Sequence, residues 1–487
     1  MRAGWRLGSS GDPAAHCQDT DIVFTSHIFL FGFLPLTLLG YWGLRSARLR
    51  LVWLTLASYI FYAAWSWKFL PLMLASTSTD FIAGRLIAHS ERQSTRRAAL
   101  VVALTINLAL LAIFKYAGFF ADSTDGLLAL LGIGRPLPIM HLVLPLGISF
   151  YTFNSMSYTI DVYRGRIPPE QSLLRYCAFV ALFPHLIAGP IVRYEQMAHQ
   201  LARLRPRLTA DMASRGLFLI ACGCSKKLLI ADSLAPDVNR LYAGHAHLGL
   251  TGAWLAALGY SLQLYFDFSG YSDIAVGLAL LLGFDFPQNF NSPFKADNIA
   301  DFWRRWHMSL SGWIRDYLYI PLGGSRGGTV RSARNLAIVM LLGGLWHGAA
   351  ATFVVWGAIH GILLAGHAVL RARGWTPSSR ALNRLATFVC VVAAFVIFRS
   401  SSLHSAGDVL GGMIGLGGVE RGSAVSALLD TRFALTIGAL LVFVNVVPNT
   451  WEVQFNGGFR KGVAYGLLLA SAILAIAGPS PFLYYQF

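Results

Sequence analysis

Charged residues are scarce in this chain of 487 residues: they make up 13% of it, whereas a soluble domain carries about 25%. Hydrophobic residues make up 55%. Several mainly apolar stretches reach the length of roughly 18 residues or more that a helix needs to cross a bilayer. The composition therefore excludes an ordinary soluble protein and predicts an all-α polytopic membrane protein in a lipid bilayer.

Motifs for metal and cofactor chemistry are also missing. The chain has no P-loop, no dinucleotide fingerprint, and no H-E-x-x-H or Cys/His metal set. Its five cysteines have spacings that fit neither a disulfide framework nor a zinc site. A formal G-x-S-x-G match at 323–327 lies in a basic loop, not at the strand–turn–helix junction that a nucleophile elbow needs. We therefore expect no metal and no permanently bound cofactor.

The formal net charge is +16, which in a soluble protein would suggest a nucleic-acid ligand. Here Arg and Lys gather in loops between apolar segments, as is typical of the cytoplasmic side of a membrane protein. We therefore expect no nucleic-acid partner. The same rule places the C-terminal tail outside, because Arg460 and Lys461 precede the last apolar segment.

We divide the chain into a polar, disordered lead at 1–21 and a single transmembrane domain at 22–487, which ends in an aromatic tail at 479–487. Residues 171–192 contain two prolines and a glycine, which predicts a broken or re-entrant helix. A short interfacial helix is expected at 122–138 and an amphipathic helix at 302–317. Apolar spans are expected near 23–43, 51–66, 69–88, 98–120, 139–160, 248–266, 336–369, 384–398, 432–447 and 461–477.

Two histidines in apolar surroundings are the leading candidates for chemistry. His347 lies inside an apolar run beside Trp346, and an ionisable residue in a membrane segment is a functional candidate by default. His307 falls on the buried edge of the 302–317 helix. The alternatives are a neutral core histidine bonded to a carbonyl and an interfacial histidine in an aromatic belt. For His360 and His367 we expect packing, because on a continuous helix His360 faces away from His347.

Asp267 and Asp273 are costly acids in an apolar setting. A structural pairing with Arg304, Arg305 or Arg315 is as consistent with the sequence as a catalytic role. A histidine base without a protein nucleophile suits direct transfer, in which the base takes a proton from a hydroxyl that attacks an activated acyl group. A transporter without chemistry of its own would also explain the broken helices and buried acids.

Six sequence blocks together resemble the bacterial membrane-bound O-acyltransferase family, of the alginate O-acetyltransferase membrane-subunit type. The resemblance covers about residues 22–487. The blocks are Phe-Thr-Ser-His-Ile-Phe-Leu-Phe at 24–31, Leu-Pro-Leu-Gly-Ile-Ser-Phe-Tyr at 144–151, Phe-Pro-His-Leu-Ile-Ala-Gly-Pro at 183–190, Gln-Leu-Tyr-Phe-Asp-Phe-Ser-Gly-Tyr-Ser-Asp at 263–273, Phe-Trp-Arg-Arg-Trp-His at 302–307 and Gly-Gly-Leu-Trp-His-Gly at 343–348.

The resemblance implies a ring of tilted helices in a bacterial inner membrane, with His347 catalytic and His307 as its partner. The supporting polar or pocket residues would be Asp267, Asp273, Arg305, Asp316 and Trp346. The donor would be acetyl-CoA or the phosphopantetheine thioester of an acyl carrier protein. A periplasmic or membrane acetyltransferase partner would receive the acetyl group and modify an exopolysaccharide such as alginate.

The C-terminal sequence Phe482-Leu-Tyr-Tyr-Gln-Phe487 resembles a terminal aromatic motif that some of these systems use as an acyl-tyrosine relay, with Tyr484 as the matching residue. From the residues alone, an aromatic tail at an interface is equally consistent with a simple membrane anchor. D-Alanyl and other acyl groups are the alternative cargoes, while the resemblance of the Gly-Gly-Ser-Arg-Gly-Gly loop at 323–328 and of the aromatic tail favours the acetyl branch.

Overall fold

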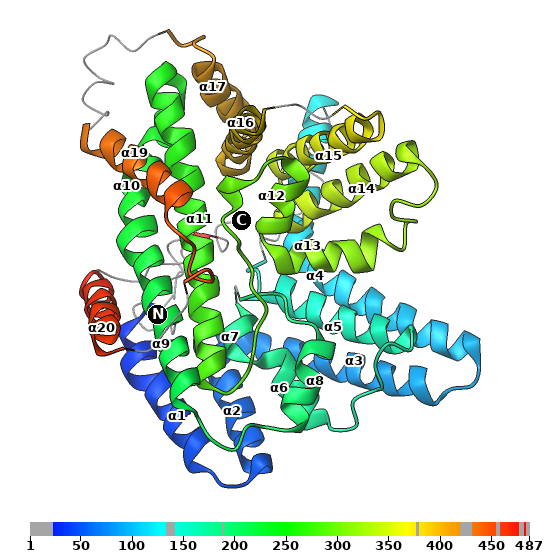
Figure 1. Ribbon diagram of the computed structural model, residues 1–487. Coiled ribbons are helices and arrows are strands. Elements are labelled where there is room, and N and C mark those ends of the chain that lie inside the picture. The colour runs from blue at the N-terminus through cyan, green and yellow to red at the C-terminus, as the bar shows by residue number, and fades with distance from the viewer. Residues whose placement is uncertain are drawn as a thin grey trace, which may run out of the picture.

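The computed structural model describes residues 23–132, 142–187, 189–375, 379–418, 431–453, 458–476 and 482–483. Within these ranges every regular element is helical, which confirms the all-α prediction. Figure 1 shows the helices arranged around a centre in which α12 and α13 lie. The expected lead at 1–21 and the candidate Tyr484 lie outside the described residues.

The principal helices of the described chain follow one another from residue 28 to residue 474. In chain order they are η2 (Ile28–Phe33), α1 (Leu34–Gly43), α2 (Ala47–Ser66), α3 (Leu70–His89), α4 (Gln93–Leu130), α5 (Ile148–Tyr163), α6 (Leu173–Ala181), α7 (Phe183–Leu186), α8 (Tyr194–Ala202), α9 (Ala210–Cys224), η4 (Ser225–Ala231), α10 (Asp232–Ala243), α11 (Leu250–Leu281), α12 (Ile299–Arg305), α13 (Met308–Ile314), η7 (Arg315–Tyr319), α14 (Thr329–His347), α15 (Ala351–Ala372), α16 (Arg380–Arg399), α17 (Leu403–Met413), α19 (Thr431–Val446) and α20 (Phe459–Leu474).

Three of the described helices are long and apolar enough to cross a membrane. They are Gln93–Asp125 within α4, Ala351–Ala372 and Arg380–Arg399. Two further apolar helical stretches, Ile28–Gly43 and Thr431–Val446, are shorter than these three. The expected separate helix at 122–138 is wrong in its first part, because α4 continues without a break to Leu130.

The predicted break within 171–192 is confirmed. Helix α6 ends at Ala181, Leu182 leaves helical geometry with ψ at 109°, and the four-residue helix α7 follows. Gly147, which precedes α5 with φ at +68°, packs directly on this turn. A Cβ atom at Gly147 would lie 2.3 Å from the carbonyl oxygen of Leu186, so only glycine lets the two segments meet.

Helix α11 is one continuous helix of 32 residues, and it extends beyond the apolar span expected near 248–266. Its backbone touches that of α9 at two glycine pairs. A Cβ atom would lie 2.6 Å from the Gly216 oxygen if added to Gly277, and 2.7 Å from the Gly223 oxygen if added to Gly270. Such contacts between small residues let two membrane helices approach closely. They also bring η4, which follows α9, against the middle of α11.

The expected helix at 302–317 has the right spacing but is interrupted at His307. Helix α12 ends at Arg305, His307 adopts the left-handed conformation with φ at 44°, and α13 starts at Met308. The preceding loop takes over backbone hydrogen bonds at this point. Met308 donates its N–H to the Asn289 oxygen at 2.9 Å, and Asn291 donates to the Arg305 oxygen at 2.9 Å. Since these pairings replace helical ones, the chain turns sharply at the histidine.

The apolar stretch at 336–369 is two helices rather than one. Helix α14 ends at His347, Gly348 is extended, and α15 begins at Ala351. The two helices pack closely through glycines: a Cβ atom at Gly344 would lie 2.3 Å from the Phe353 oxygen, and one at Gly357 would lie 2.5 Å from the Met340 oxygen. Because α15 folds back along α14, the direction expected for His360 on a continuous helix is wrong.

Candidate functional site

The structure brings the side chains of His307 and His347 next to the same indole ring, that of Trp346. The Trp346 ring centroid lies 6.3 Å from that of His307 and 5.0 Å from that of His347. His307 is 0% exposed and His347 is 5% exposed. The Trp346 ring itself stacks on Phe153 of α5, 5.1 Å between centroids. His307, from the break between α12 and α13, therefore forms one buried imidazole–indole–imidazole group with Trp346 and His347 of α14, and this group is the candidate active site.

The side chain of His307 is held through one nitrogen. Its Nδ1 lies 3.1 Å from Oδ1 of Asn289. The same Oδ1 accepts the backbone N–H of Ser309 at 3.2 Å and its hydroxyl at 2.9 Å. A backbone N–H can only donate, so this amide atom is the oxygen, and the His307 Nδ1 facing it must carry the proton. The lone pair of the neutral ring then lies on Nε2.

The Nε2 atom of His307 is buried and has no hydrogen-bond partner within the described part of the chain. A neutral imidazole with Nδ1 protonated can accept a proton only at Nε2. A buried polar atom without a partner calls for an explanation, and a binding site for a substrate hydroxyl is one. The arrangement can therefore supply a proton acceptor in a water-poor environment.

Asn289 was not a candidate from the sequence, where it belongs to a polar, turn-rich segment after α11. In the structure, its Nδ2 donates to the Ser272 hydroxyl of α11 at 3.1 Å. The end of the same segment is fixed at Asp297, which accepts from Arg380 at 3.0 Å and from Arg384 at 2.5 Å. Hydrogen bonds from these two arginines lower the pKa of Asp297 to about 2. The segment is thereby fastened at Asn289, the residue that holds His307, and at its carboxyl end.

His347 sits at the last position of α14, in a cluster of aromatic rings. Its ring centroid lies 5.1 Å from that of Trp356 and 5.4 Å from that of Phe398, both at steep edge-on angles. These rings come from α15 and α16, so three helices converge on the imidazole. Packing against these rings thus constrains the orientation of the imidazole.

His360 belongs to the same aromatic cluster, contrary to its expected direction. Trp356 lies 4.7 Å from the His360 ring and also contacts His347. The indole N–H of Trp303 donates to Nδ1 of His360 at 3.3 Å. Because that bond uses the imidazole lone pair, His360 is not a ready proton acceptor, which agrees with the packing role favoured from the sequence.

Asp267 and Asp273 pair with lysines of η4, so the structural pairing suggested with Arg304, Arg305 or Arg315 is wrong. Asp267 lies 2.7 Å from Lys227, and Asp273 lies 2.6 Å from Lys226. The close contact of α9 with α11 explains this choice of partner, because η4 follows α9 directly. The carboxylates therefore join η4 to α11 within the core.

The C-terminal tail reaches the site through Asp267. Its carboxylate accepts the backbone N–H of Leu483 at 3.1 Å. The ring of Phe482, only 1% exposed, lies 5.4 Å from that of Phe268, and the Phe268 ring lies 4.7 Å from that of His307. Burial of this kind is not expected of a simple interfacial anchor. One aromatic ring thus separates the described part of the tail from the candidate catalytic pair.

The other two candidates, Arg305 and Asp316, take part in ion pairs around α12 and η7. Arg305 pairs with Asp301 at 2.8 Å and also donates to the Asn291 oxygen at 3.2 Å, which supports the loop that carries Asn289. Asp316 pairs with Arg193 and Arg315, each at 2.7 Å. Arg305 therefore supports the His307 region indirectly, while Asp316 belongs to a separate charged cluster.

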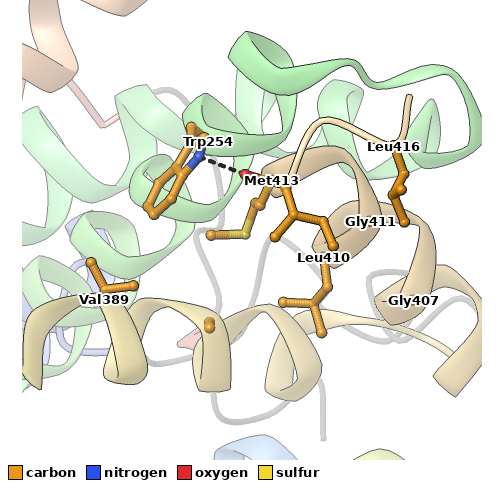
Figure 2. A pocket seen from close by; sticks show the side chains of 9 residues that line it. Trp254, Val389, Gly407, Leu410, Gly411, Met413 and Leu416 are labelled. Carbon is orange, nitrogen blue, oxygen red and sulfur yellow. Dashed lines mark hydrogen bonds between the residues drawn. The ribbon is translucent and has the colours of Figure 1, made fainter. Parts of the chain in front are cut away.

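An apolar hollow of about 440 Å³ lies between α11, α16 and α17 (Figure 2). Trp254 lines it and donates its indole N–H to the Met413 oxygen at 3.0 Å. Neither catalytic candidate is among its lining residues. Among the residues that the structure describes, no group of three or more His, Cys, Asp or Glu side chains could hold a metal ion.

Comparison with known proteins agrees with this geometry. Residues 162–405 match the membrane-bound O-acyltransferase family, and both histidines lie within that region. The chain is 41% identical to the probable alginate O-acetylase AlgI of Pseudomonas putida, over 96% of this chain and all of that protein. It is 39% identical to the peptidoglycan O-acetyltransferase of Helicobacter pylori, over 82% of this chain and 81% of that one. It is 31% identical to the teichoic acid D-alanyltransferase of Bacillus subtilis, over 55% of this chain and 71% of that one.

The chain belongs to the membrane-bound O-acyltransferase family. It is accordingly a multi-pass membrane acyltransferase, and the alternative of a transporter without chemistry of its own is not supported.

Proposed function

We propose that this protein takes an acetyl group from a cytoplasmic thioester and passes it across the bacterial inner membrane for O-acetylation of an exopolysaccharide such as alginate. The observation that carries the proposal is the buried pair His307 and His347 around Trp346, with Nε2 of His307 uncommitted among the described residues. The names of the relatives from Pseudomonas and Helicobacter favour an acetyl cargo and a cell-surface polymer as acceptor.

In the proposed reaction, His347 and His307 act as the catalytic pair on an acceptor hydroxyl. The hydroxyl oxygen attacks the thioester carbonyl and its proton moves to an imidazole nitrogen. The C–O bond forms, the C–S bond breaks, and the departing thiolate takes the proton back from the imidazolium. General-base help of this kind contributes roughly 10²- to 10⁴-fold to the rate.

The proposed donor is acetyl-CoA or an acetylated acyl carrier protein, both of which present the acetyl group as a thioester. A thioester carbonyl is already activated, so the scheme uses no metal and no permanently bound cofactor. The proposed final acceptor is reached through a separate periplasmic or membrane acetyltransferase that modifies the polysaccharide.

We also propose Tyr484 as the first acyl acceptor. Support comes from the two residues before it, since Phe482 packs on Phe268 and Leu483 is anchored by Asp267 close to His307. The proposal assigns the acetyl group to the phenol of the residue that directly follows this anchored segment. The resulting phenyl ester would remain activated enough to pass the acetyl group on to the partner.

D-Alanyl transfer is the second candidate for the cargo, favoured by the 31% identity to the Bacillus subtilis enzyme. The same catalytic pair would serve it, because a D-alanyl thioester offers the same carbonyl. Donor competition separates the two: an acetyl enzyme labels from acetyl thioester, while a D-alanyl enzyme labels only from the D-alanyl thioester of a carrier protein.

The decisive experiment uses full-length protein in proteoliposomes with radiolabelled acetyl-CoA or acetylated carrier protein. We expect label on the wild-type protein and none on His347→Ala, His307→Ala or Tyr484→Phe, with His367→Ala as the matched histidine control that keeps the label. Label lost only in the histidine variants would overturn the Tyr484 relay and leave the transferase. Full turnover in His347→Ala with either donor would overturn the catalytic pair.

A further inference from the structure

The carboxyl end of α14 has backbone carbonyl groups that no N–H of the helix can bond. The last four carbonyls of an α-helix have no partner within it, and here they belong to residues 344–347. Gly348 donates its N–H to the Gly344 oxygen, which leaves the carbonyls of Leu345, Trp346 and His347. These residues carry the candidate site and are packed among aromatic rings, where an unbonded carbonyl is costly.

Two adjacent residues of α4 donate hydrogen bonds to all three carbonyls. The Lys115 ammonium donates to the Trp346 oxygen at 2.5 Å and to the His347 oxygen at 3.0 Å. The Tyr116 hydroxyl donates to the Leu345 oxygen at 2.5 Å. The three bonds span the last turn of α14, and they come from more than 200 positions away in the chain.

The charge of Lys115 also suits its place. It lies inside the apolar stretch Gln93–Asp125, where a lysine is expensive unless it has a specific partner. The carboxyl end of a helix carries partial negative charge, so an ammonium there is stabilising. The same ammonium lies 5.8 Å from the centre of the Trp346 ring, the indole that contacts both histidines.

We propose that Lys115, assisted by Tyr116, is a positioning residue for His347. It fixes the carbonyls on both sides of the His347 backbone and the ring beside it, so that the imidazole keeps the orientation needed for acyl transfer. The inference rests on the proposed function. Small displacements at an active site are costly, since an error of about 1 Å can lower a rate roughly 100-fold.

The test compares Lys115→Met, Lys115→Arg and Tyr116→Phe in proteoliposomes, with rates expressed per folded protein. Lys115→Met is expected to lower kcat about 10-fold or more with KM for the thioester changed less than about twofold, because it affects orientation and not donor binding. Lys115→Arg keeps the charge and the donors and should restore most of the rate. Tyr116→Phe, which removes one hydroxyl, should lower kcat about threefold. The matched control Lys68→Met, at an exposed lysine near the start of α3, should match wild type.

A double-variant cycle separates positioning of His347 from a general structural role. If Lys115 acts through His347, adding Lys115→Met to His347→Ala lowers the residual rate no further. Equal fold losses in both backgrounds, or unchanged kcat in Lys115→Met, would overturn the inference. If Lys115→Met fails to fold, the nearly isosteric Tyr116→Phe carries the test, and an unchanged kcat there counts against the proposal. Full activity in His347→Ala would instead reject the proposed function itself.

Discussion

The two histidines of the candidate site are held in opposite ways. His307 has a strained, left-handed backbone and a side chain fixed by a hydrogen bond to Asn289. His347 ends a regular helix, with its backbone carbonyl bonded to Lys115 and its ring packed against aromatic neighbours. The first arrangement fixes which nitrogen carries the proton, and the second fixes the helix end and the direction of the ring. The difference indicates that His307 has a set protonation pattern and His347 a set position.

The largest effect on the rate is expected when either imidazole is removed. We expect His307→Ala and His347→Ala to lower kcat by roughly 10²- to 10⁴-fold each, in the range of lost general-base help. Because the two rings act on one transfer, the double variant should lose little more than the worse single variant. Steady-state rates with acetyl thioester check this, and a product of the two single losses would argue against a joint role.

Replacement of Asp267 tests the side of the site that lies next to the tail. Asp267→Leu removes one of the carboxylates that pair with the buried Lys227 and frees the Leu483 N–H, so the free energy of unfolding should fall by about 3 kcal/mol. Asp267→Asn keeps an acceptor for Leu483 and should protect the tail better from carboxypeptidase. Thermal unfolding in detergent and digestion timed by mass spectrometry measure both. Equal tail protection in the two variants would show that Asp267 does not anchor the tail.

Changing Asn289 sharpens the contrast between the two histidines. Asn289→Leu removes the acceptor for Nδ1 of His307, which frees the ring to adopt the other tautomer, and kcat should fall about 30-fold. Loss of the correct tautomer in a serine-protease triad costs about 10⁴-fold, which sets an upper limit. Asn289→Asp retains an acceptor for Nδ1 of His307, so its kcat should fall less. A rate for Asn289→Leu equal to wild type would remove the argument for a fixed tautomer.

The smallest effect is expected at His360, the histidine that we assign to packing. Trp303→Phe deletes the indole N–H bonded to His360, so stability should drop by about 1 kcal/mol while kcat stays within about twofold. Thermal unfolding and steady-state rates test this together. A large loss of kcat without a loss of stability would bring His360 into the catalytic group.

Much of the fold could be predicted from the sequence because apolar runs and prolines act locally. The break within 171–192 and the helices at 51–66 and 69–88 depend on residues inside those stretches. The pairing of His307 with His347 came from the family resemblance, since no local pattern encodes a contact between separate helices. The break at His307 escaped prediction because helical spacing says nothing about a competing loop 18 positions earlier, which supplies Asn289.

The partners of the buried acids were missed for a related reason. Arg304, Arg305 and Arg315 lie in the polar stretch next to the candidate histidine, so they were the obvious cations from the sequence. In the structure the acids pair with Lys226 and Lys227, because glycines let α9 pack closely against α11. That contact depends on the absence of side chains at four glycines, which has no signature in a hydropathy pattern.

The anchoring of Leu483 on Asp267 has a consequence for the timing of biosynthesis. The two residues are 216 positions apart, and chains grow at about 5–20 residues per second. The Asp267 carboxylate and the Phe268 ring therefore exist for roughly 10–40 s before their tail partner is made. During that interval the helices around both histidines can assemble while the tail is still absent. The contact of Leu483 with Asp267 therefore forms only after α11 and the segments that carry both histidines have been synthesised.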